Sequence, residues 1–472
     1  MNALLFAKAV TQYDRKSRIH QEDADEPYRS PFEVDRDRVL HSFDFRRLAG
    51  ITQAANASEG PQLHNRLTHS LKVAQVGRRL AQVLQKETSQ EDIEACGGLD
   101  LDVVETACLA HDLGHPPFGH TAENVLQECL SQIEYIGRIE YSDKYLDHPD
   151  GFEGNAQTFR VVAKNSIRRE KSGLNLTLAT LNAVQKYPWA RNDQERRPKS
   201  EKKWGFYSEE REQFEIAQSI LPIHRKGKQT LEASAMDLAD DISYSGHDVD
   251  DFYRAGLIPL EQLLVQSTER TKFLNKYADR LSHYVDEGES PIEKAVEILD
   301  GIGFLGANLL LPFRNTLPQL QDLHKITSNR IKRFLGSSEA FKGKSFWIDS
   351  SVADAESQLI RSKKLDFEIR LLKLLMEHYV YHDNVLLAQQ EGHRRVVRDS
   401  FETIAMHIQK DGMDGLVPCQ FEAEAEKAKG NPFAAGRLAA DIICHLDESQ
   451  LLLFYQRISG LRPGALSERL GY

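Results

Sequence analysis

The 472-residue sequence predicts an all-α protein, a helical bundle with a C-terminal helical extension. Segments rich in Leu, Ala, Glu, Lys and Arg recur along the chain, and the runs 356–388 and 434–458 are typical of long helices. Strand signals are few, and the clearest is the short aromatic and apolar run 344–348. No repeat period is visible, so the sequence does not indicate a solenoid.

Three helices are predicted in the first half of the chain. His69, Val73, Val76, Leu80 and Val83 keep a spacing of three or four residues and therefore form one apolar stripe. An apolar run over 103–110 and a run of small and apolar residues over 231–244 predict two more. Glycine and proline predict helix ends near 256–259, 301–303 and 460–463, and Gly246 is a candidate end for the 231–244 helix.

No linker is long and polar enough to separate independent domains. The sequence therefore predicts one helical body. Residues 1–260 form its core, with the main motifs between about 60 and 250, and residues 261–472 form a C-terminal helical part of the same body. The segment 190–204 is the best candidate for a mobile excursion.

The composition restricts the classes of function. A net charge of −11 argues against nucleic-acid binding by the average surface. The basic run 196–203 favours an exposed flexible insert, with nucleic-acid contact or an allosteric phosphate site as alternatives. Five cysteines without paired spacing, no secretory segment and no apolar run of membrane-spanning length predict a cytoplasmic protein with reduced thiols.

The most informative stretch is His-Asp-Leu-Gly-His-Pro-Pro-Phe-Gly-His, residues 111–120. Histidine and aspartate are common ligands of divalent metals. Side chains of adjacent residues diverge on a regular helix, so His111 and Asp112 can share one ion only where the helix ends. Gly114 and Pro116 predict such an end. The pair therefore indicates a metal site.

Further ligands must come from other helices. His69 begins an apolar stripe, although a lone histidine there is more often an ordinary core residue. The helix over 231–244 carries Asp237, Asp240 and Asp241, and carboxylates in so apolar a segment need a partner or a metal when buried. The alternative is an acidic solvent face, and spacing alone does not separate Asp240 from Asp241.

Two other spacings indicate cooperation between side chains. His120 and Glu123 share one face if both lie on the helix that starts near them, so the carboxylate can orient the imidazole. Asp240, Tyr244 and Asp248 recur at four-residue intervals and share a face for as long as their helix lasts.

These features together resemble the HD-domain metal-dependent phosphohydrolases, and more narrowly the bacterial dGTPase family of deoxynucleoside triphosphate triphosphohydrolases. The matching stretches follow family order over the first half of the chain, with a weaker match at 391–399. They are residues 30–38, 45–48, Gln53, 64–70, 111–120, 151–157, 174–177, 186–189 and 239–244.

The resemblance implies an HD-domain helical bundle that holds one divalent metal per active site. The metal ligands it implies are His69, His111, Asp112 and Asp240, since the family register of Asp followed by Tyr four residues later selects Asp240. Two imidazoles and two carboxylates suit Mn, Mg, Ni, Co, Fe or Zn, so the ion is left open.

The resemblance also assigns roles around the metal. His120 is implied as general acid or base with Glu123 orienting it, and a protonated His115 as a catalytic and phosphate-contacting group. The implied substrate contacts are Gln53, Arg66, His115, Lys186, Tyr187, Tyr244 and Asp248.

The implied reaction is hydrolysis of a dNTP, dGTP or dNTPs generally, to a deoxynucleoside and tripolyphosphate. The resemblance further implies a homo-oligomer, such as a hexamer, with single-stranded DNA or an allosteric nucleotide as possible partners. The alternatives are another HD-domain nucleotidase or phosphodiesterase, or a nucleotide or single-strand nucleic-acid sensor that retains the same pocket.

Overall fold

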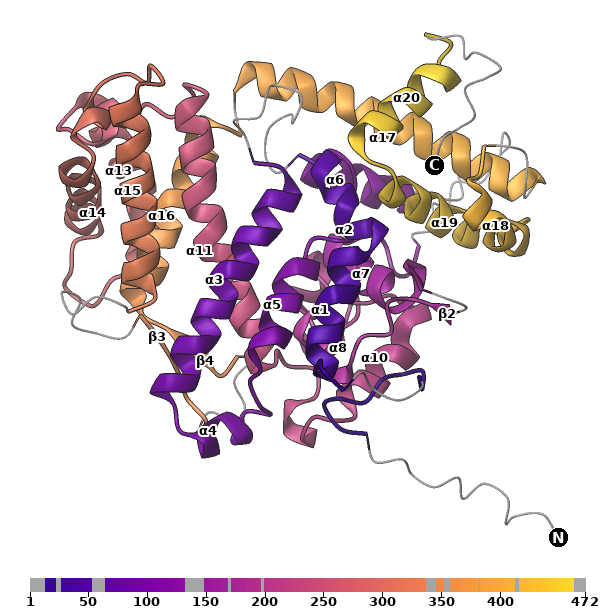
Figure 1. Ribbon diagram of the computed structural model, residues 1–472. Helices are drawn as coiled ribbons and strands as arrows, with labels where there is room; N and C mark the ends of the chain where they lie inside the picture. Colours follow the sequence, from indigo (N-terminus) through magenta and orange to yellow (C-terminus); the bar gives the residue numbers. More distant parts are fainter. Residues whose placement is uncertain are drawn as a thin grey trace.

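The computed structural model describes residues 13–22, 27–52, 64–131, 148–168, 171–196, 199–336, 345–351, 357–381, 383–411 and 416–461. Over these residues the protein is an all-α fold (Figure 1), as predicted, with two small two-stranded antiparallel sheets. In the same residues, no helix combines the length and the apolar character needed to cross a bilayer.

The N-terminal half contains the helices that carry the predicted metal ligands, α3 (Arg66–Glu87), α5 (Leu101–Ala110) and α11 (Leu231–Arg254), coloured indigo to magenta in Figure 1. Its other helices in the described residues are α1 (Pro31–His41), α2 (Phe43–Arg47), α4 (Gln90–Ala95), α6 (Gly119–Leu130), α7 (Gly154–Arg160), α8 (Leu178–Ala183), α9 (Lys199–Lys202) and α10 (Arg211–Gln218). Strands β1 (Ile167–Arg168) and β2 (Lys171–Ser172) pair as a short hairpin.

The C-terminal half adds a second set of helices and one hairpin. The helices are α12 (Leu260–Leu263), α13 (Thr268–Ser282), α14 (Pro291–Leu305), α15 (Leu317–Phe334), α16 (Lys363–Tyr379), α17 (Asn384–Asp411), α18 (Glu422–Ala428), α19 (Pro432–His445) and α20 (Glu448–Ile458). Strand β3 (Phe346–Ile348) pairs with β4 (Leu359–Arg361), with Trp347 opposite Ile360.

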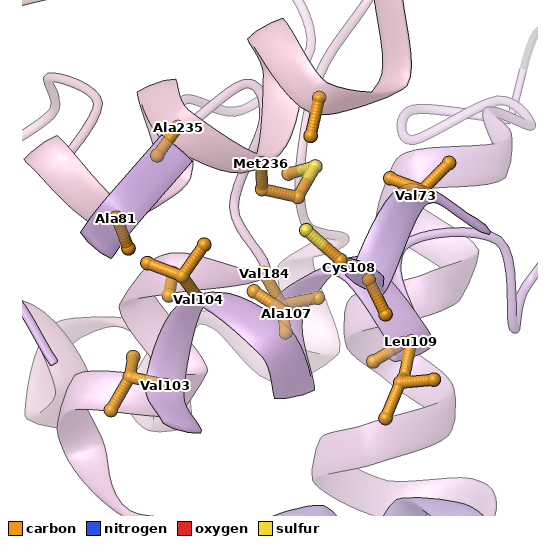
Figure 2. Close-up of a cluster of buried hydrophobic side chains, with 14 of the residues drawn as sticks. Val73, Ala81, Val103, Val104, Ala107, Cys108, Leu109, Val184, Ala235 and Met236 are labelled. Carbon is orange, nitrogen blue, oxygen red and sulfur yellow. The ribbon is translucent and has the colours of Figure 1, made fainter. Parts of the chain in front are cut away.

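Helices α3, α5 and α11 pack against one another around the central core. Their apolar side chains interlock, as Figure 2 shows for Val73 of α3, Val104 and Cys108 of α5, and Met236 of α11. The approach of α3 to α5 needs a residue without a side chain at position 77, because a Cβ there would lie 2.4 Å from the Cys108 sulfur. The three helices that carry the predicted metal ligands thus form one tightly packed unit.

Two further cores join the halves of the chain. Apolar residues of α6, including Val125 and Leu126, are buried with residues of α17, α19 and α20. The C-terminal part of α11, with Phe252 and Tyr253, is buried with residues of α13 to α16. Helices α6 and α11 therefore each belong to two packing units, which fixes the C-terminal helices around the motif-bearing ones.

Several predicted boundaries are confirmed and others are wrong. The strand near 344–348 and the helix ends near Gly256 and Gly460 are present. The run 356–388 is not one helix, since it contains β4, α16 and the start of α17. The run 434–458 breaks at Asp447, whose side chain forms a capping box with Gln450 at the start of α20.

The glycines predicted to end two helices do not do so. Helix α14 continues through 301–303 to Leu305, and α11 continues through Gly246 to Arg254. Fully buried apolar residues precede the glycines in both helices, and buried Phe252 in α11 and partly buried Leu305 in α14 follow them. This burial outweighs the roughly 1 kcal/mol intrinsic cost of glycine in a helix. The continuity of α11 keeps Asp240, Tyr244 and Asp248 on one face.

Truncation of Leu80 to alanine should destabilise the protein strongly. Leu80 is fully buried on α3, and removing such a side chain costs about 2–5 kcal/mol because a cavity remains. Leu71 lies on the same helix but is 46% exposed, so Leu71→Ala is the matched control and should cost less than about 1 kcal/mol. Urea unfolding of both variants measures the difference, and equal losses would contradict the packing described.

Candidate metal centre and active site

The His111–Asp112 pair lies where α5 ends, as predicted. His111 is the C-cap residue of α5, and its Nδ1 lies 2.6 Å from the carbonyl oxygen of Cys108 one turn earlier. Since a carbonyl only accepts hydrogen bonds, Nδ1 is the nitrogen that carries a proton here. The helix end therefore leaves Nε2 as the ring nitrogen that is available to a metal.

The turn after α5 is fastened to α7. The Thr158 hydroxyl donates to the His111 carbonyl (3.0 Å) and accepts from the Gly114 amide (3.0 Å). A Cβ at position 114 would lie 2.1 Å from the Thr158 nitrogen, so only glycine permits this approach. The glycine in the motif thus allows close contact between two backbones.

Arg47 holds the same turn from the other side. Its buried guanidinium donates to the carbonyl oxygens of Leu113 (2.8 Å) and His115 (2.9 Å), and also to that of Leu446 near the end of α19 (3.1 Å). Residues 45–48 belong to the set of matching stretches in the sequence. Arg47 of this stretch hydrogen-bonds to the backbone of the turn that carries His111 and Asp112 and so holds it in place.

Three of the four predicted metal ligands converge from three helices. His69 of α3, His111 at the end of α5 and Asp240 of α11 place ligand atoms within 4.8 Å of one another. The Oδ1 of Asp240 lies 3.2 Å from His69 Nε2 and 3.7 Å from His111 Nε2. Residues far apart in the sequence thus form one group suited to a divalent ion.

Asp112 stands at the edge of this group. Its Oδ1 lies 3.5 Å from His111 Nε2 and 3.1 Å from His115 Nδ1, while its Oδ2 accepts from Arg66 (2.6 Å). Asp240 is arranged in the same way, since its Oδ2 accepts from Lys186 (3.1 Å). In each aspartate one oxygen faces the imidazoles and the other faces a cation, so the residues present fit a metal.

The cations keep both aspartates ionised. Burial opposes the charge of Asp112, yet Arg66 and the neighbouring imidazoles lower the pKa of that carboxyl far below its usual value. Burial likewise opposes the charge of Asp240, and Lys186 together with His69 lowers its pKa well below the usual value. Ionised carboxylates are the form that binds a metal.

Asp241 takes no part in this group. Its carboxylate accepts from Arg361 (2.6 Å) and Lys373 (2.5 Å), on a different side of α11 from Asp240. The structure thereby separates the two adjacent aspartates that spacing alone left unresolved.

A second group of acid–base side chains adjoins the first. His115, His120 and Glu123 place ligand-type atoms within 4.8 Å of one another. His120 and Glu123 lie on α6, as predicted, and His120 Nδ1 is 2.8 Å from Glu123 Oε2. The His120 side chain is 68% exposed, whereas Glu123 is buried. The buried carboxylate therefore holds an imidazole that is open to solvent.

The expected charge of His115 is not favoured. Burial, followed by the nearby charge of Arg66, lowers the pKa of His115 to about 3. This lowered pKa favours the neutral imidazole, whereas the resemblance implies a protonated one. Positive charge at the site comes from Arg66, Lys186 and Lys203.

Lys203 and Glu153 belong to the site and were missed by sequence reasoning. Lys203 Nζ donates to Glu123 Oε1 (3.0 Å) and to Glu153 Oε1 (2.7 Å). Burial opposes the charge on Glu123, but the hydrogen bond from His120 and the charge of Lys203 lower its pKa well below the usual value. The buried Trp204 directly after Lys203 was the available signal that the chain returns inward here.

The basic run 196–203 is consequently not a simple exposed insert. Ser200 is buried within α9, and the Arg196 guanidinium lies 4.8 Å from the centre of the Trp189 ring. Residues 197–198 lie outside the described part of the chain. The last residue of the run, Lys203, donates hydrogen bonds to Glu123 and Glu153.

The remaining predicted substrate contacts have partners of their own. Tyr244 is hydrogen-bonded through its hydroxyl to that of Tyr381 (2.6 Å), a residue that the sequence did not indicate. Burial, together with Asp251, raises the pKa of Asp248 well above its usual value. Tyr187 packs beside Trp189, and Gln53 lies outside the described residues.

The weak C-terminal match at 391–399 contacts the site region directly. It lies on α17, where the His393 ring stacks on Phe118 at 4.0 Å. Arg394 and Arg398 both donate to Glu128 of α6. This motif therefore covers the turn that leads from the metal ligands to His120.

Comparison with known proteins agrees with this geometry. The HD domain family model matches residues 66–245, which include both side-chain groups. A deoxyguanosinetriphosphate triphosphohydrolase-like protein of Streptomyces coelicolor is 32% identical over 95% of this chain and 98% of the relative. The chain belongs to this family.

Two further relatives are also named deoxyguanosinetriphosphate triphosphohydrolase-like proteins. The protein of Corynebacterium efficiens is 31% identical over 94% of this chain and 96% of its own length, and that of Corynebacterium glutamicum is 34% identical over 90% of each. Membership of this HD-domain, dGTPase-like family supports a nucleotide triphosphohydrolase, and the similarity extends through the C-terminal helices.

Replacement of Asp240 should remove metal binding. Asp240→Asn takes a negative charge from the ligand group, so the affinity for Mn²⁺ should fall by at least about tenfold. Asp241→Asn changes the adjacent residue on the arginine- and lysine-facing side and should bind Mn²⁺ like the parent protein. Calorimetric titration of both variants measures this, and equal affinities would show that Asp240 is not a ligand.

Proposed function

We propose that the protein is a metal-dependent hydrolase of deoxynucleoside triphosphates that releases a deoxynucleoside and tripolyphosphate. The observation that carries the proposal is the adjacency of two groups. A ligand set of two imidazoles and two carboxylates lies next to an acid–base pair, and three cations stand around them.

Three cationic side chains lie beside the proposed ligand group, where they could contact a triphosphate. Arg66 and Lys186 each touch a metal-ligand aspartate, and Lys203 touches Glu123. A guanidinium and two ammonium groups attract phosphate oxygens and stabilise charge that develops on them during phosphoryl transfer. A bound divalent ion would polarise the phosphoryl group and lower the pKa of water beside it.

His120 is suited to move the proton. Glu123 is ionised and accepts from Nδ1–H, so the Nε2 of His120 keeps a lone pair and can take a proton from water. The protonated imidazole can then deliver a proton to the departing 5′-oxygen of the nucleoside. Glu123 orients the ring and stabilises its charged form, and Lys203 holds Glu123 in place.

The α11 face supports a deoxyribose contact. Tyr244 and Asp248 lie one turn apart on the face that carries Asp240. The raised pKa of Asp248 favours the protonated carboxyl, which can donate to and accept from a sugar hydroxyl. The Tyr244 ring, whose hydroxyl is hydrogen-bonded to that of Tyr381, is the group that we propose to pack against the deoxyribose.

Product analysis tests the proposal. The purified protein would be given each dNTP and each NTP with Mn²⁺ or Mg²⁺. We expect deoxynucleoside and tripolyphosphate, with ribonucleotides untouched, and the same experiment reports the base preference. Orthophosphate or pyrophosphate as the first product would instead establish a nucleotidase or phosphodiesterase reaction.

Removing the charge of Glu123 should slow turnover. Glu123→Gln no longer fixes the protonated His120, so kcat should fall by about 10²- to 10⁴-fold with a small change in KM. Glu128→Gln is the matched control on α6, because Glu128 contacts Arg394 and Arg398 away from the metal group. Steady-state kinetics of both variants decide the point, and similar kcat values would exclude this role for Glu123.

A further inference from the structure

We propose that the protein has a second ligand site, a cavity between α2, α7, α18 and α19 that binds an uncharged heteroaromatic molecule of the nucleoside or nucleobase class. The cavity has a volume of about 690 Å³, within the range of small-molecule sites. It is lined neither by the predicted metal ligands nor by His115, His120 and Glu123, so it is distinct from the proposed active site. In Figure 1 the four helices lie together on one side of the molecule.

One wall of the cavity is built for stacking. The Phe43 ring lies 4.5 Å from the His445 ring in a stacked arrangement, and Phe421 meets His445 edge-on at 5.6 Å. Phe43 is 40% exposed despite its aromatic side chain, so part of its ring surface is open. Aromatic rings that line a cavity and remain partly open are suited to stack on a flat heterocycle.

The charges around the cavity are balanced. Its lining contains four basic side chains, Arg160, Lys164, Lys427 and Arg437, and four carboxylates, Asp44, Glu209, Glu424 and Asp441. The basic groups nearest the core are already paired, since Arg160 binds Asp441 at 2.8 Å and Lys164 binds Glu209. The cavity thus lacks the surplus positive charge that a triphosphate requires, which favours an uncharged ligand.

Two residues of the cavity wall carry buried polar atoms whose hydrogen-bonding capacity is unused. Gln157 Oε1 and Arg437 Nη1 are buried and have no hydrogen-bond partner among the described residues. One accepts and the other donates, and the edges of nucleobases offer both donors and acceptors. A buried polar atom without a hydrogen-bond partner lowers the stability of the folded state. A small movement of the cavity wall that let Gln157 Oε1 and Arg437 Nη1 bond to a ligand would remove this cost.

Helix α7 connects the cavity to the metal centre. Its last residue, Arg160, and Gln157 both bind Asp441 at the cavity, while Thr158 between them binds the carbonyl of His111. At its first residue, the Gly154 amide donates to Glu123 at 3.0 Å. A ligand that shifts α7 therefore moves groups in contact with both parts of the active site, so occupancy of the cavity should alter metal affinity.

The test is direct binding to the full chain without metal or turnover. Deoxyguanosine, thymidine and adenine would be titrated calorimetrically, with dGTP as the charged comparison. We expect saturable binding of at least one uncharged probe. Phe43→Leu removes the ring but keeps an apolar side chain, and it should weaken this binding by roughly five- to a hundredfold through lost stacking.

A matched pair of tryptophan variants distinguishes the cavity from the active site. Ala434→Trp fills the cavity that Ala434 lines, whereas Ala423→Trp places the same side chain at an exposed position of α18 outside the lining. The first variant should lose the site and the second should keep it, with circular dichroism confirming that both are folded. Binding that survives both Ala434→Trp and Phe43→Leu would overturn the proposal, as would an absence of binding by every uncharged probe.

The coupling has its own readout. Mn²⁺ affinity would be measured with and without the saturating probe, and a change of about fivefold or more is expected in the parent protein but not in Ala434→Trp. This step rests on the proposed metal site, whereas probe binding does not. An unchanged Mn²⁺ affinity would overturn the coupling and leave the ligand site standing, and failure of Mn²⁺ to bind at all would count against the proposed function.

Discussion

The site depends on how Asp112 and Asp240 use their two carboxylate oxygens. In each residue one oxygen accepts a hydrogen bond from a cation and the other lies beside the imidazoles. Each carboxylate is removed from bulk water and would resist ionisation if it stood alone. Arg66 and Lys186 provide the compensating charge at one oxygen and leave the other directed at the imidazoles. Arg66 and Lys186 therefore stabilise the ionised carboxylates in the protein itself, and we propose that they also bind phosphate oxygens of the substrate.

This arrangement requires a rigid helix end, and both halves of the chain supply the rigidity. Thr158 and Arg47 fix the backbone after α5, and Glu448 of α20 accepts from the Phe118 amide (3.1 Å) and the Thr52 amide (2.8 Å). Long-range hydrogen bonds to backbone groups hold a turn more firmly than local propensity does, because every buried amide and carbonyl needs a partner. The C-terminal helices are thus part of the support of the metal centre.

The sequence predicts the local features of this site well. The end of α5 follows from Gly114 and Pro116, and the His120–Glu123 contact follows from helical spacing. Lys203 and Tyr381 could not be found in this way, because they join the site through contacts 50 or more residues apart in sequence and have no periodicity of their own. Glu153 lies in the matching stretch 151–157, but its spacing did not show that it contacts Lys203. Tertiary burial also overrides local signals, since α14 and α11 pass through the glycines that were expected to end them.

The contact between Gly77 and Cys108 has a consequence for how the protein tolerates mutation. Gly77 lies two turns after His69 on α3, and Cys108 lies one turn before His111 on α5, so this contact sets the spacing of the two helices and, through them, of the two imidazoles. Any side chain at position 77 would crowd the Cys108 sulfur, so we expect it to disturb the packing of α3 on α5 without touching either imidazole. We therefore expect mutations that abolish metal binding at Gly77 in the core as well as at the ligands themselves.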